Sequence, residues 1–240
     1  MNELQGKRIV ILGGTSGFGL ATTQAAATEG AEVIIASSNI NRVNKALETL
    51  PANSKGYAVN LTGEQQVQEL FGKIGAFDHL VFTAGETIPL TALDTIDLNE
   101  TKTLFNLRFW GAIMAAKYGS GYINKGGSIT LTNGIVGIRP WKGWSIAASI
   151  CGAIESLTRS LAVELAPIRV NAVCAGMVNT NLWSNIPEAE RQAMFAQTGA
   201  QLPVGRIGEA EDIAQTYLYL MKQQFGTGQI LVVDGGATIV

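Results

Sequence analysis

The amino-acid sequence alternates short apolar runs with helix-length segments from one end to the other, and this alternation limits the folds open to the chain. The apolar runs, each expected to form a strand, cover residues 8–12, 32–36, 56–59, 79–83, 128–132, 168–174 and 229–233. Most are apolar at nearly every position, as parallel strands buried on both faces are. The segments expected to form helices cover residues 17–29, 41–50, 63–74, 99–119, 144–166 and 209–221. The pattern predicts one α/β domain over residues 1–240, a doubly wound parallel sheet of about seven strands with helices on both faces.

Composition and charge exclude several classes of protein. Lys and Arg number 17 against 19 for Asp and Glu, so the chain lacks the basic excess of a nucleic-acid-binding protein. No apolar run approaches the length of a membrane helix, and the first residues, MNELQGKRIV, do not read as a signal peptide. Two cysteines and one histidine predict neither a disulfide scaffold nor a metal site. We therefore expect a cytoplasmic protein that binds a small molecule. Its single histidine, His79, begins a buried strand and is expected to be structural.

A glycine-rich turn, GGTSGFG at residues 13–19, follows the first predicted strand and opens the first predicted helix. Glycines in this place allow a sharp turn and a close approach of the backbone to a pyrophosphate, whose charge the helix N-terminus stabilises. The spacing differs by one residue from the common dinucleotide-binding fingerprint. Plain strand–helix packing is the alternative, but the position of the turn favours nucleotide binding.

The loop after the second predicted strand contains no acidic residue. A carboxylate at this point would hold the ribose hydroxyls of NAD and repel the 2′-phosphate of NADP. The loop reads Ser37-Ser38-Asn39-Ile40-Asn41-Arg42, with hydroxyls, amides and one cation. This composition suits a 2′-phosphate, and the alternative is a solvated loop in which Arg42 caps a helix.

Motifs along the whole chain together resemble those of the short-chain dehydrogenase/reductase family. Besides the glycine turn, they are residues 82–85 (FTAG), 157–171 (LTRSLAVELAPIRVN), 174–180 (CAGMVNT), 203–206 (PVGR), 211–214 (EDIA) and 233–236 (VDGG). Two of them depart from the family pattern. FTAG keeps only the Ala-Gly half of the usual Asn-Asn-Ala-Gly, and Ala175 stands where the family has proline. The combination is far more specific than any one motif.

The resemblance implies a Rossmann-type fold, NADP(H) as cofactor, and a homotetramer, with a homodimer as the alternative. The residues that it implies for cofactor binding are Gly13, Thr15, Ser16, Gly17, Phe18, Ser37, Ser38, Arg42, Asn60, Leu61, Thr83, Ala84, Gly85, Thr132, Gly176, Val178 and Thr180. Family members pair their fourth and fifth helices between subunits. Apolar residues that we expect at such an interface are Leu104, Phe105, Phe109, Trp110 and Ile113.

The catalytic residues of the family are missing from the positions that the resemblance assigns to them. The family uses Asn, Ser, Tyr and Lys, of which Tyr donates a proton and Lys lowers its pKa and holds the nicotinamide ribose. An ungapped alignment from Leu161 places Arg108, Gly134, Ala147 and Cys151, in that order, at these four positions. Tyr118 and Tyr122 lie in the preceding helix and loop and do not restore the pattern. Ordinary ketone reduction by the family mechanism is therefore not expected.

Three hypotheses follow for function. The first is an oxidoreductase acting on a small, apolar carbonyl, enone or imine, with a replacement proton source or a substrate that needs none. The second is a cofactor-binding sensor or regulatory protein, and the third an enzyme that binds NADP(H) but guides a reaction such as a cyclisation. Candidate replacements are Arg108, Asn133 and Ser145, with Arg139, Trp141 and Trp144 in the same region; Trp183 and residues 179–200 occupy the family's substrate lid.

Overall fold

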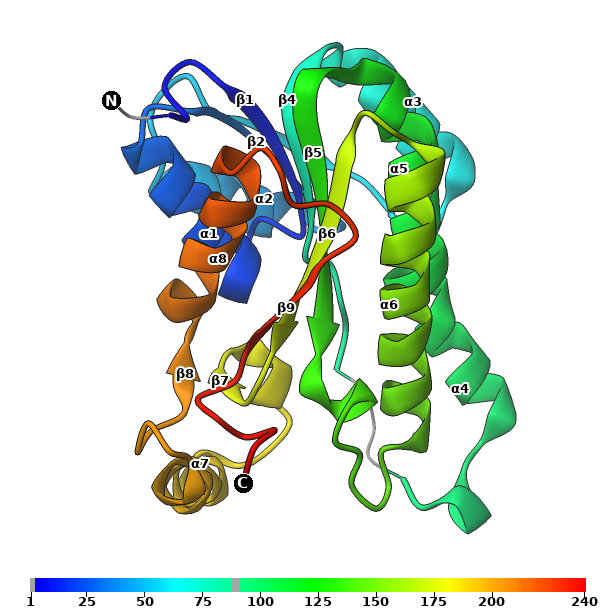
Figure 1. Ribbon diagram of the computed structural model, residues 1–240, viewed down its shortest axis with the longest axis vertical. Helices are drawn as coiled ribbons and strands as arrows, with labels where there is room; N and C mark the ends of the chain where they lie inside the picture. The colour runs from blue at the N-terminus through cyan, green and yellow to red at the C-terminus, as the bar shows by residue number, and fades with distance from the viewer. Residues whose placement is uncertain (1–2, 88–90) are drawn as a thin grey trace.

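A computed structural model of the chain describes residues 3–87 and 91–240 and is built on a parallel sheet of seven strands (Figure 1). The order across the sheet is β3-β2-β1-β4-β5-β6-β9. The strands are β1 (Arg8–Leu12), β2 (Glu32–Ser37), β3 (Lys55–Ala58), β4 (Phe77–Phe82), β5 (Ile123–Gly134), β6 (Arg169–Ala175) and β9 (Ile230–Val233). The order reverses between β1 and β4, the point where open sheets of this type bind ligands at the carboxyl ends of their strands. The predicted fold class and strand number are confirmed.

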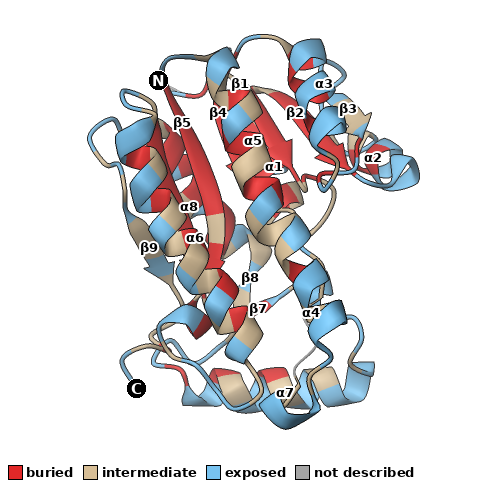
Figure 2. Ribbon diagram, turned by 90° about the vertical axis from the view of Figure 1, so that its right-hand side faces the viewer, coloured by how far each residue is buried: buried red, intermediate tan, exposed pale blue. Residues whose placement is uncertain are grey.

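Helices cover both faces of the sheet, as predicted (Figure 1). The helices are α1 (Gly17–Thr28), α2 (Ile40–Leu47), α3 (Glu64–Ile74), α4 (Leu98–Phe105), α5 (Gly111–Gly119), α6 (Ser145–Glu164), α7 (Glu188–Gln201) and α8 (Ala210–Lys222). Successive strand residues point to opposite faces, so Ile9 and Ile11 pack in the core cluster of α1 and α8, whereas Val10 and Leu12 pack in that of α3, α5 and α6. Figure 2 shows the strands as the most buried layer.

The predicted helix over residues 99–119 proves to be two helices joined by a π-helical turn. The turn, Asn106–Trp110, separates α4 from α5 and carries Arg108. Such turns insert an extra residue into a helix and are frequent at functional sites, and they have no local sequence signature. Leu104, expected at a subunit interface, is instead buried in the core at the end of α4, while Trp110 is exposed.

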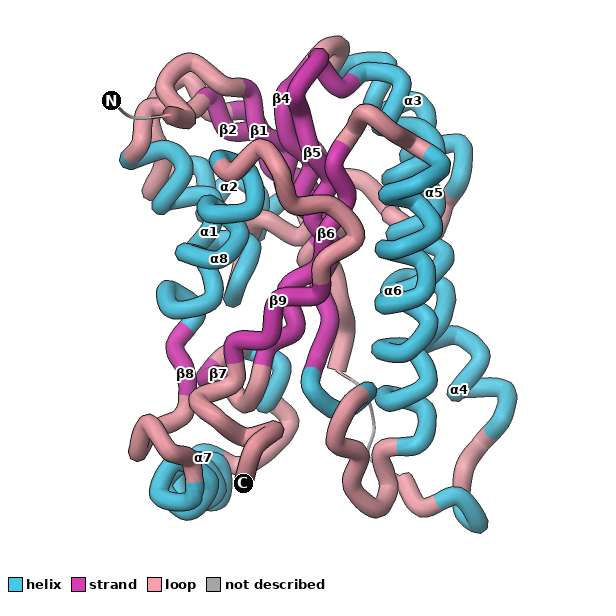
Figure 3. The backbone as a smooth tube through the Cα atoms, in the orientation of Figure 1, coloured by secondary structure: helices cyan, strands magenta, loops and turns pink. Residues whose placement is uncertain are grey.

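The segment over residues 179–200, which the resemblance assigns to the family's substrate lid, contains a 3-10 turn and a helix. A short strand, β7 (Val178–Asn179), pairs in parallel with β8 (Gly208–Glu209). A 3-10 turn, Asn181–Trp183, and α7 follow β7. Figure 3 shows β7, β8 and α7 beyond the carboxyl ends of the central strands, beside the end of β9. The segment therefore closes that edge of the molecule.

Helix α6 is long and apolar enough to cross a membrane by length and composition alone. Core helices of water-soluble folds pass the same test, and here Ile150 and Ile154 are buried against β5 and β6. The opposite side of the helix is exposed, with Val163 81% accessible. The sequence had suggested that no segment reaches this length and apolarity, so that expectation was too strict for α6.

His79 is buried in β4, and its Nδ1 lies 2.9 Å from the Oγ of Ser128 in β5. Burial lowers the pKa of His79 to about 4, with Asp78 acting in the opposite direction. The imidazole is therefore neutral at neutral pH and joins two central strands. This agrees with the structural role expected from the sequence.

Candidate active site

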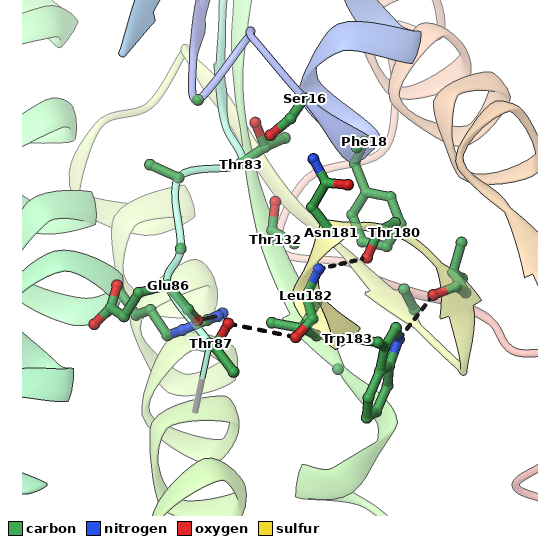
Figure 4. Close-up of a pocket in the computed structure, with 18 of the residues that line it drawn as sticks. Ser16, Phe18, Thr83, Glu86, Thr87, Thr132, Thr180, Asn181, Leu182 and Trp183 are labelled. Carbon is green, nitrogen blue, oxygen red and sulfur yellow. Dashed lines mark hydrogen bonds between the residues drawn. The ribbon is translucent and has the colours of Figure 1, made fainter. Parts of the chain in front are cut away.

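A single cavity of about 1770 Å³ runs along the carboxyl ends of the strands, from the end of β2 to the segment that follows β7. All the residues that the sequence implied for cofactor binding line it. So do Arg108, Gly134, Ala147 and Cys151, the four positions that the ungapped alignment assigned to the family's catalytic residues. Figure 4 shows part of this cavity, with Ser16, the residue before α1, beside Thr83, and with Glu86 and Phe18 on opposite sides of the view. Residues from distant parts of the sequence therefore meet in one space.

The glycine turn lies at the start of the cavity and leaves the N-terminus of α1 open to it. Gly13 has a φ of +94°, and a side chain there would lie 2.6 Å from the backbone nitrogen of Ala84. Only glycine combines this conformation with this approach. Ser16, the residue before α1, makes no capping hydrogen bond, and the first turn of the helix contains no acid. Free N–H groups and the helix dipole therefore favour an anion at this point.

The end of β2 supplies hydroxyl groups and cations to the same end of the cavity as the glycine turn. Ser37, Ser38, Arg42 and Lys45 all line it. Asn39, not Arg42, caps α2, because its Oδ1 accepts hydrogen bonds from the N–H groups of Asn41 and Arg42. The cap leaves the Arg42 side chain exposed on the first turn. Sequence reasoning missed Lys45, although its spacing of three from Arg42 puts both on one helix face.

Two threonines at the middle of the cavity are held by hydrogen bonds to the sheet. Thr83 Oγ1 donates to the carbonyl oxygen of Leu12 at 3.2 Å. Thr132 Oγ1 lies 2.6 Å from the carbonyl oxygen of Phe82 and 2.5 Å from the hydroxyl of Tyr217. The Thr132 hydroxyl is thus fully engaged within the protein. The two threonines fix the shape of the cavity wall where β4 and β5 end.

The four positions that the alignment assigned to the family's catalytic residues all line the cavity, and three of them are neighbours, because Cys151 lies close to both Gly134 and Arg108. A side chain at Gly134 would meet the Sγ of Cys151 at 3.6 Å, an ordinary contact. Ala147 is buried on the same side of α6. Burial raises the pKa of the Cys151 thiol, against the effect of the Arg108 cation and of nearby N–H groups. The thiol is therefore protonated at neutral pH.

Among the described residues that line the cavity there is neither a tyrosine nor a histidine. Tyr118, on α5, instead hydrogen-bonds to Glu64 on α3 at 2.5 Å, outside the cavity. Tyr122 lies in the 3-10 turn Ser120–Tyr122 and does not line it either. Both tyrosines therefore lie outside the lining of the cavity.

The predicted replacement residues are placed differently from one another. Asn133 lines the cavity and donates through Nδ2 to Glu155 at 3.2 Å, while its buried Oδ1 has no partner. Ser145 begins α6, is exposed and does not line the cavity. Glu86, which sequence reasoning missed, lines the cavity, and burial raises the pKa of its carboxyl group. Its place directly after the FTAG motif was the available signal.

An aromatic row forms the outer wall at one end of the cavity. The ring centroids are 5.7 Å apart for Trp141 and Trp144, 6.4 Å for Trp144 and Trp183, and 6.4 Å for Trp183 and Phe195. All three tryptophans line the cavity. Trp183 Nε1 donates to the carbonyl oxygen of Val178 at 2.9 Å, as Figure 4 shows. The row therefore joins the loop before α6 to the segment around α7.

A polar contact bridges the cavity beside this row. Thr87 Oγ1 donates to the carbonyl oxygen of Leu182 at 3.4 Å, linking the segment after β4 to the turn after β7 (Figure 4). Together with the aromatic row, the contact holds the 179–200 segment over one end of the cavity.

Comparisons with known proteins agree with this geometry. A family model described as enoyl-(acyl carrier protein) reductase matches residues 13–238. The short-chain dehydrogenase/reductase ATR9 of Stachybotrys chlorohalonatus is 38% identical over 99% of this chain and 99% of its own.

Solved structures resemble the chain over nearly its full length. A small-chain dehydrogenase in complex with NADPH is 37% identical, covers 98% of this chain and 100% of its own, and superposes with a TM-score of 0.88. The MalC reductase/Diels-Alderase of Malbranchea aurantiaca is 30% identical, covers 100% of this chain and 99% of its own, and has a TM-score of 0.92. The chain therefore belongs to the short-chain dehydrogenase/reductase family.

Proposed function

We propose that the protein is an NADP(H)-dependent oxidoreductase that acts on a flat, apolar substrate with a carbonyl, enone or imine group. The observation that carries this proposal is one continuous cavity with two different ends. Its first end offers a helix N-terminus, hydroxyls and cations, and its other end offers three indole rings. Phosphates suit the first end, and an apolar or aromatic substrate suits the second.

The residues present fit NADP(H). The N-terminus of α1 would hold the pyrophosphate, and Ser37, Ser38, Arg42 and Lys45 would hold the 2′-phosphate. Three residues on the cavity wall, Glu86, Arg108 and Asn133, each carry a buried polar atom that has no partner among the described residues. The 37% identical relative solved with NADPH supports the same cofactor. When bound, NADP(H) supplies or accepts the hydride.

The substrate-side chemistry is unusual for the family. Ala147 has no proton to give, and the protonated thiol of Cys151 is a poor replacement for an ammonium group. Losing a general acid costs about 10²–10⁴ in rate, so simple ketones are poor substrates. An imine that is already protonated needs no acid from the protein. We therefore rank imines first among the three substrate classes.

A second candidate is a cyclisation guided by the same cavity. The reductase/Diels-Alderase named above is 30% identical to this chain, and its description joins a reduction to a ring-forming reaction. An apolar, aromatic wall can fold a flexible substrate without any change at the cofactor. A sensor or regulatory protein without turnover remains the third alternative.

NADPH oxidation, followed by absorbance over panels of imines, enones and ketones, tests the proposal. We expect imines to be reduced fastest and simple ketones at close to background rates. Both Trp183→Phe and Trp183→Ala lose the hydrogen bond from the indole N–H to Val178, but only Trp183→Phe keeps an aromatic ring. The alanine variant should raise KM about fivefold or more, from the lost stacking, and the phenylalanine variant should raise it less.

Three outcomes would count against this proposal. Absence of NADPH consumption with every substrate class would favour the sensor, and product formation without NADPH consumption would favour the cyclisation. Ketone reduction at ordinary family rates would refute the unusual chemistry.

We also propose that the protein assembles as a homotetramer in the cytoplasm. Leu98, Trp110 and Val163 expose 65%, 53% and 81% of their surfaces along α4, the π-helical turn and α6. Figure 2 shows α4, α5 and α6 on one side of the molecule. Light scattering should give a mass near four times the 25.4 kDa of one chain. A mass near that of one chain at micromolar concentration would contradict assembly.

A further inference from the structure

The π-helical turn between α4 and α5 brings the Arg108 side chain against the segment that follows β4. A side chain built at Gly85 would lie 2.7 Å from the Cζ of Arg108 and 2.8 Å from each of its Nη atoms. The guanidinium group therefore occupies the place that any larger residue at position 85 would fill. One Nη donates a hydrogen bond to the carbonyl oxygen of Glu86.

The guanidinium and the neighbouring carboxyl group both retain unused hydrogen-bonding capacity. Arg108 Nε and Glu86 Oε2 are buried, and neither has a hydrogen-bond partner among the described residues. Both residues line the cavity. A buried polar group without a partner costs free energy, and a buried charge costs more. The arrangement is therefore suited to a polar ligand group at this point.

The charge of Arg108 lies close to position 151 on α6, where the family has its lysine. Cys151 holds the lysine position on α6, and Arg108 is the cation that lowers the pKa of its thiol against burial. Arg108 itself stays charged, because a guanidinium is not deprotonated in proteins. Burial lowers the pKa of the Arg108 guanidinium, and Glu86 and Cys151 act in the opposite direction.

We propose that Arg108 supplies, from the π-helical turn, the cation that α6 supplies in other members of the family. Its Nε and a free Nη hold the ribose hydroxyls at the nicotinamide end of the bound cofactor, and Glu86 is its counter-ion. The inference rests on the proposed cofactor. In this proposal the cofactor-binding cation comes from Arg108 in the π-helical turn, and Cys151 stands at the position on α6 where the family has lysine.

Binding measurements without turnover test this assignment. We expect Arg108→Asn to weaken NADPH binding about tenfold to a hundredfold, because charge-assisted hydrogen bonds are lost. Arg108→Lys, which keeps the charge, should lose only a few-fold. The double variant Arg108→Asn with Cys151→Lys should recover most of the affinity, because the cation returns from α6. Cys151→Lys alone should bind no better than the wild type, since two cations would then meet.

The ratio of the NADP⁺ and NADPH dissociation constants gives a second readout. A cation beside the nicotinamide disfavours its oxidised, positively charged ring, whereas the adenosine contacts are the same for both forms. Arg108→Asn should therefore narrow the preference for NADPH over NADP⁺ by a few-fold. A merely structural role, in which Arg108 only pins the Glu86 carbonyl, would lower the melting temperature and leave this ratio unchanged.

Arg139→Asn is the matched control, because Arg139 is a second cation on the cavity wall and donates to the carbonyl of Ala237. Equal losses in the Arg108 and Arg139 variants would indicate a general charge effect and overturn the assignment. So would NADPH binding by Arg108→Asn at wild-type strength, or a double variant no better than the single one. If wild-type protein does not bind NADPH, the proposed function falls together with this inference. Binding by the wild type with no loss in Arg108→Asn removes the inference alone.

Discussion

The two ends of the cavity differ in the part of the protein that forms their walls. The phosphate end consists mainly of backbone: a glycine turn, the first N–H groups of α1 and the loop that ends β2. The substrate end consists of side chains from segments far apart in the sequence, namely the segment after β4, the π-helical turn, the loop before α6 and the segment after β7. Backbone geometry tolerates sequence change elsewhere, whereas a wall of side chains changes with each substitution. A substitution can therefore change the substrate end and leave the phosphate end intact.

The largest effect is expected at the phosphate end, from Gly13→Ala. The new side chain meets the Ala84 nitrogen at 2.6 Å, and the φ of +94° is unfavourable for alanine. Strain of about 1–2 kcal/mol from the dihedral adds to about 1–3 kcal/mol from the clash. We expect the melting temperature to fall and NADPH binding to weaken by roughly a hundredfold.

Gly6→Ala is the control for this variant. Gly6 also has a positive φ, +73°, but no atom lies within 4 Å of a side chain built there. It should show the dihedral cost alone and leave NADPH binding intact. Similar losses of binding in both variants would show that backbone approach at the glycine turn is not what holds the cofactor.

The next effect concerns the substrate end and restores the family's catalytic residues. Gly134→Ser, Ala147→Tyr and Cys151→Lys should raise simple ketone reduction, by up to about a hundredfold, since a general acid contributes 10²–10⁴. A serine fits at position 134, where the nearest atom is 3.6 Å away. Position 147 is buried, so tyrosine needs the adjacent wall to move.

Arg108→Asn should be added to this combination, because a lysine at 151 would otherwise face the Arg108 cation. The quadruple variant should therefore exceed the triple variant in initial rate with a simple ketone. A triple variant that is already as fast, with unimpaired NADPH binding, would show that the two cations do not interfere. Circular dichroism spectra identify any combination that fails to fold.

The same contrast decides what could be predicted from sequence. The phosphate end could be predicted from local residues. Gly13 and the loop without an acid after Ala36 are recognisable in the sequence, and both directly follow buried parallel strands, which places them at the same edge of the sheet. The substrate end follows only in part. The family resemblance already identified Arg108, and the structure places it on the cavity wall, but the sequence predicted a continuous helix where the structure has a π-helical turn. Glu86 likewise gains a candidate role only through its contact with Arg108, which the sequence does not reveal.

Helix α7 illustrates another limit. Only Phe195 and Gly199 are buried within it, so the apolar stripe that marks most helices is almost absent. Ser145 shows a different limit. It follows Trp144 in the sequence and was expected near the substrate, but it lies in the first turn of α6 and does not line the cavity, whereas Trp144 does. Short-range patterns therefore predicted the sheet and the phosphate end, whereas long-range packing determined the rest.

A third prediction concerns the stability of the sheet that carries both ends of the cavity, which should depend on pH through His79. His79 has a pKa of about 4 in the folded protein, below its usual 6.5, because it is buried. The unfolded chain therefore binds a proton that the folded chain rejects, and stability is fully present above pH 7.5 and falls as the pH drops toward 4. At pH 5 the loss is about 2 kcal/mol.

Denaturant unfolding between pH 7.5 and 5 measures this loss. His79→Asn keeps a polar group near Ser128 without a titrating ring, so its stability should change less over this range. If both ends of the cavity depend on the sheet, NADPH binding and any turnover should fail together as the wild type unfolds. An equally steep pH dependence in His79→Asn would assign the effect to other groups.

The smallest effect is expected where exposed side chains supplement the backbone at the phosphate end. Arg42→Ala and Lys45→Ala should each weaken NADPH binding roughly fivefold to tenfold and leave NADH binding unchanged, because only NADPH has the 2′-phosphate.

Ser38→Asp should reverse the preference for NADPH over NADH, since a carboxylate repels the 2′-phosphate and accepts hydrogen bonds from the free ribose hydroxyls of NADH. Arg159→Ala, which removes an exposed cation of α6 paired with Glu155, is the control. Fluorescence titration with both cofactors measures these changes. Equal losses for NADPH and NADH would mean that the cations attract the pyrophosphate generally, and tighter NADH than NADPH binding in the wild type would contradict the preference for NADPH altogether.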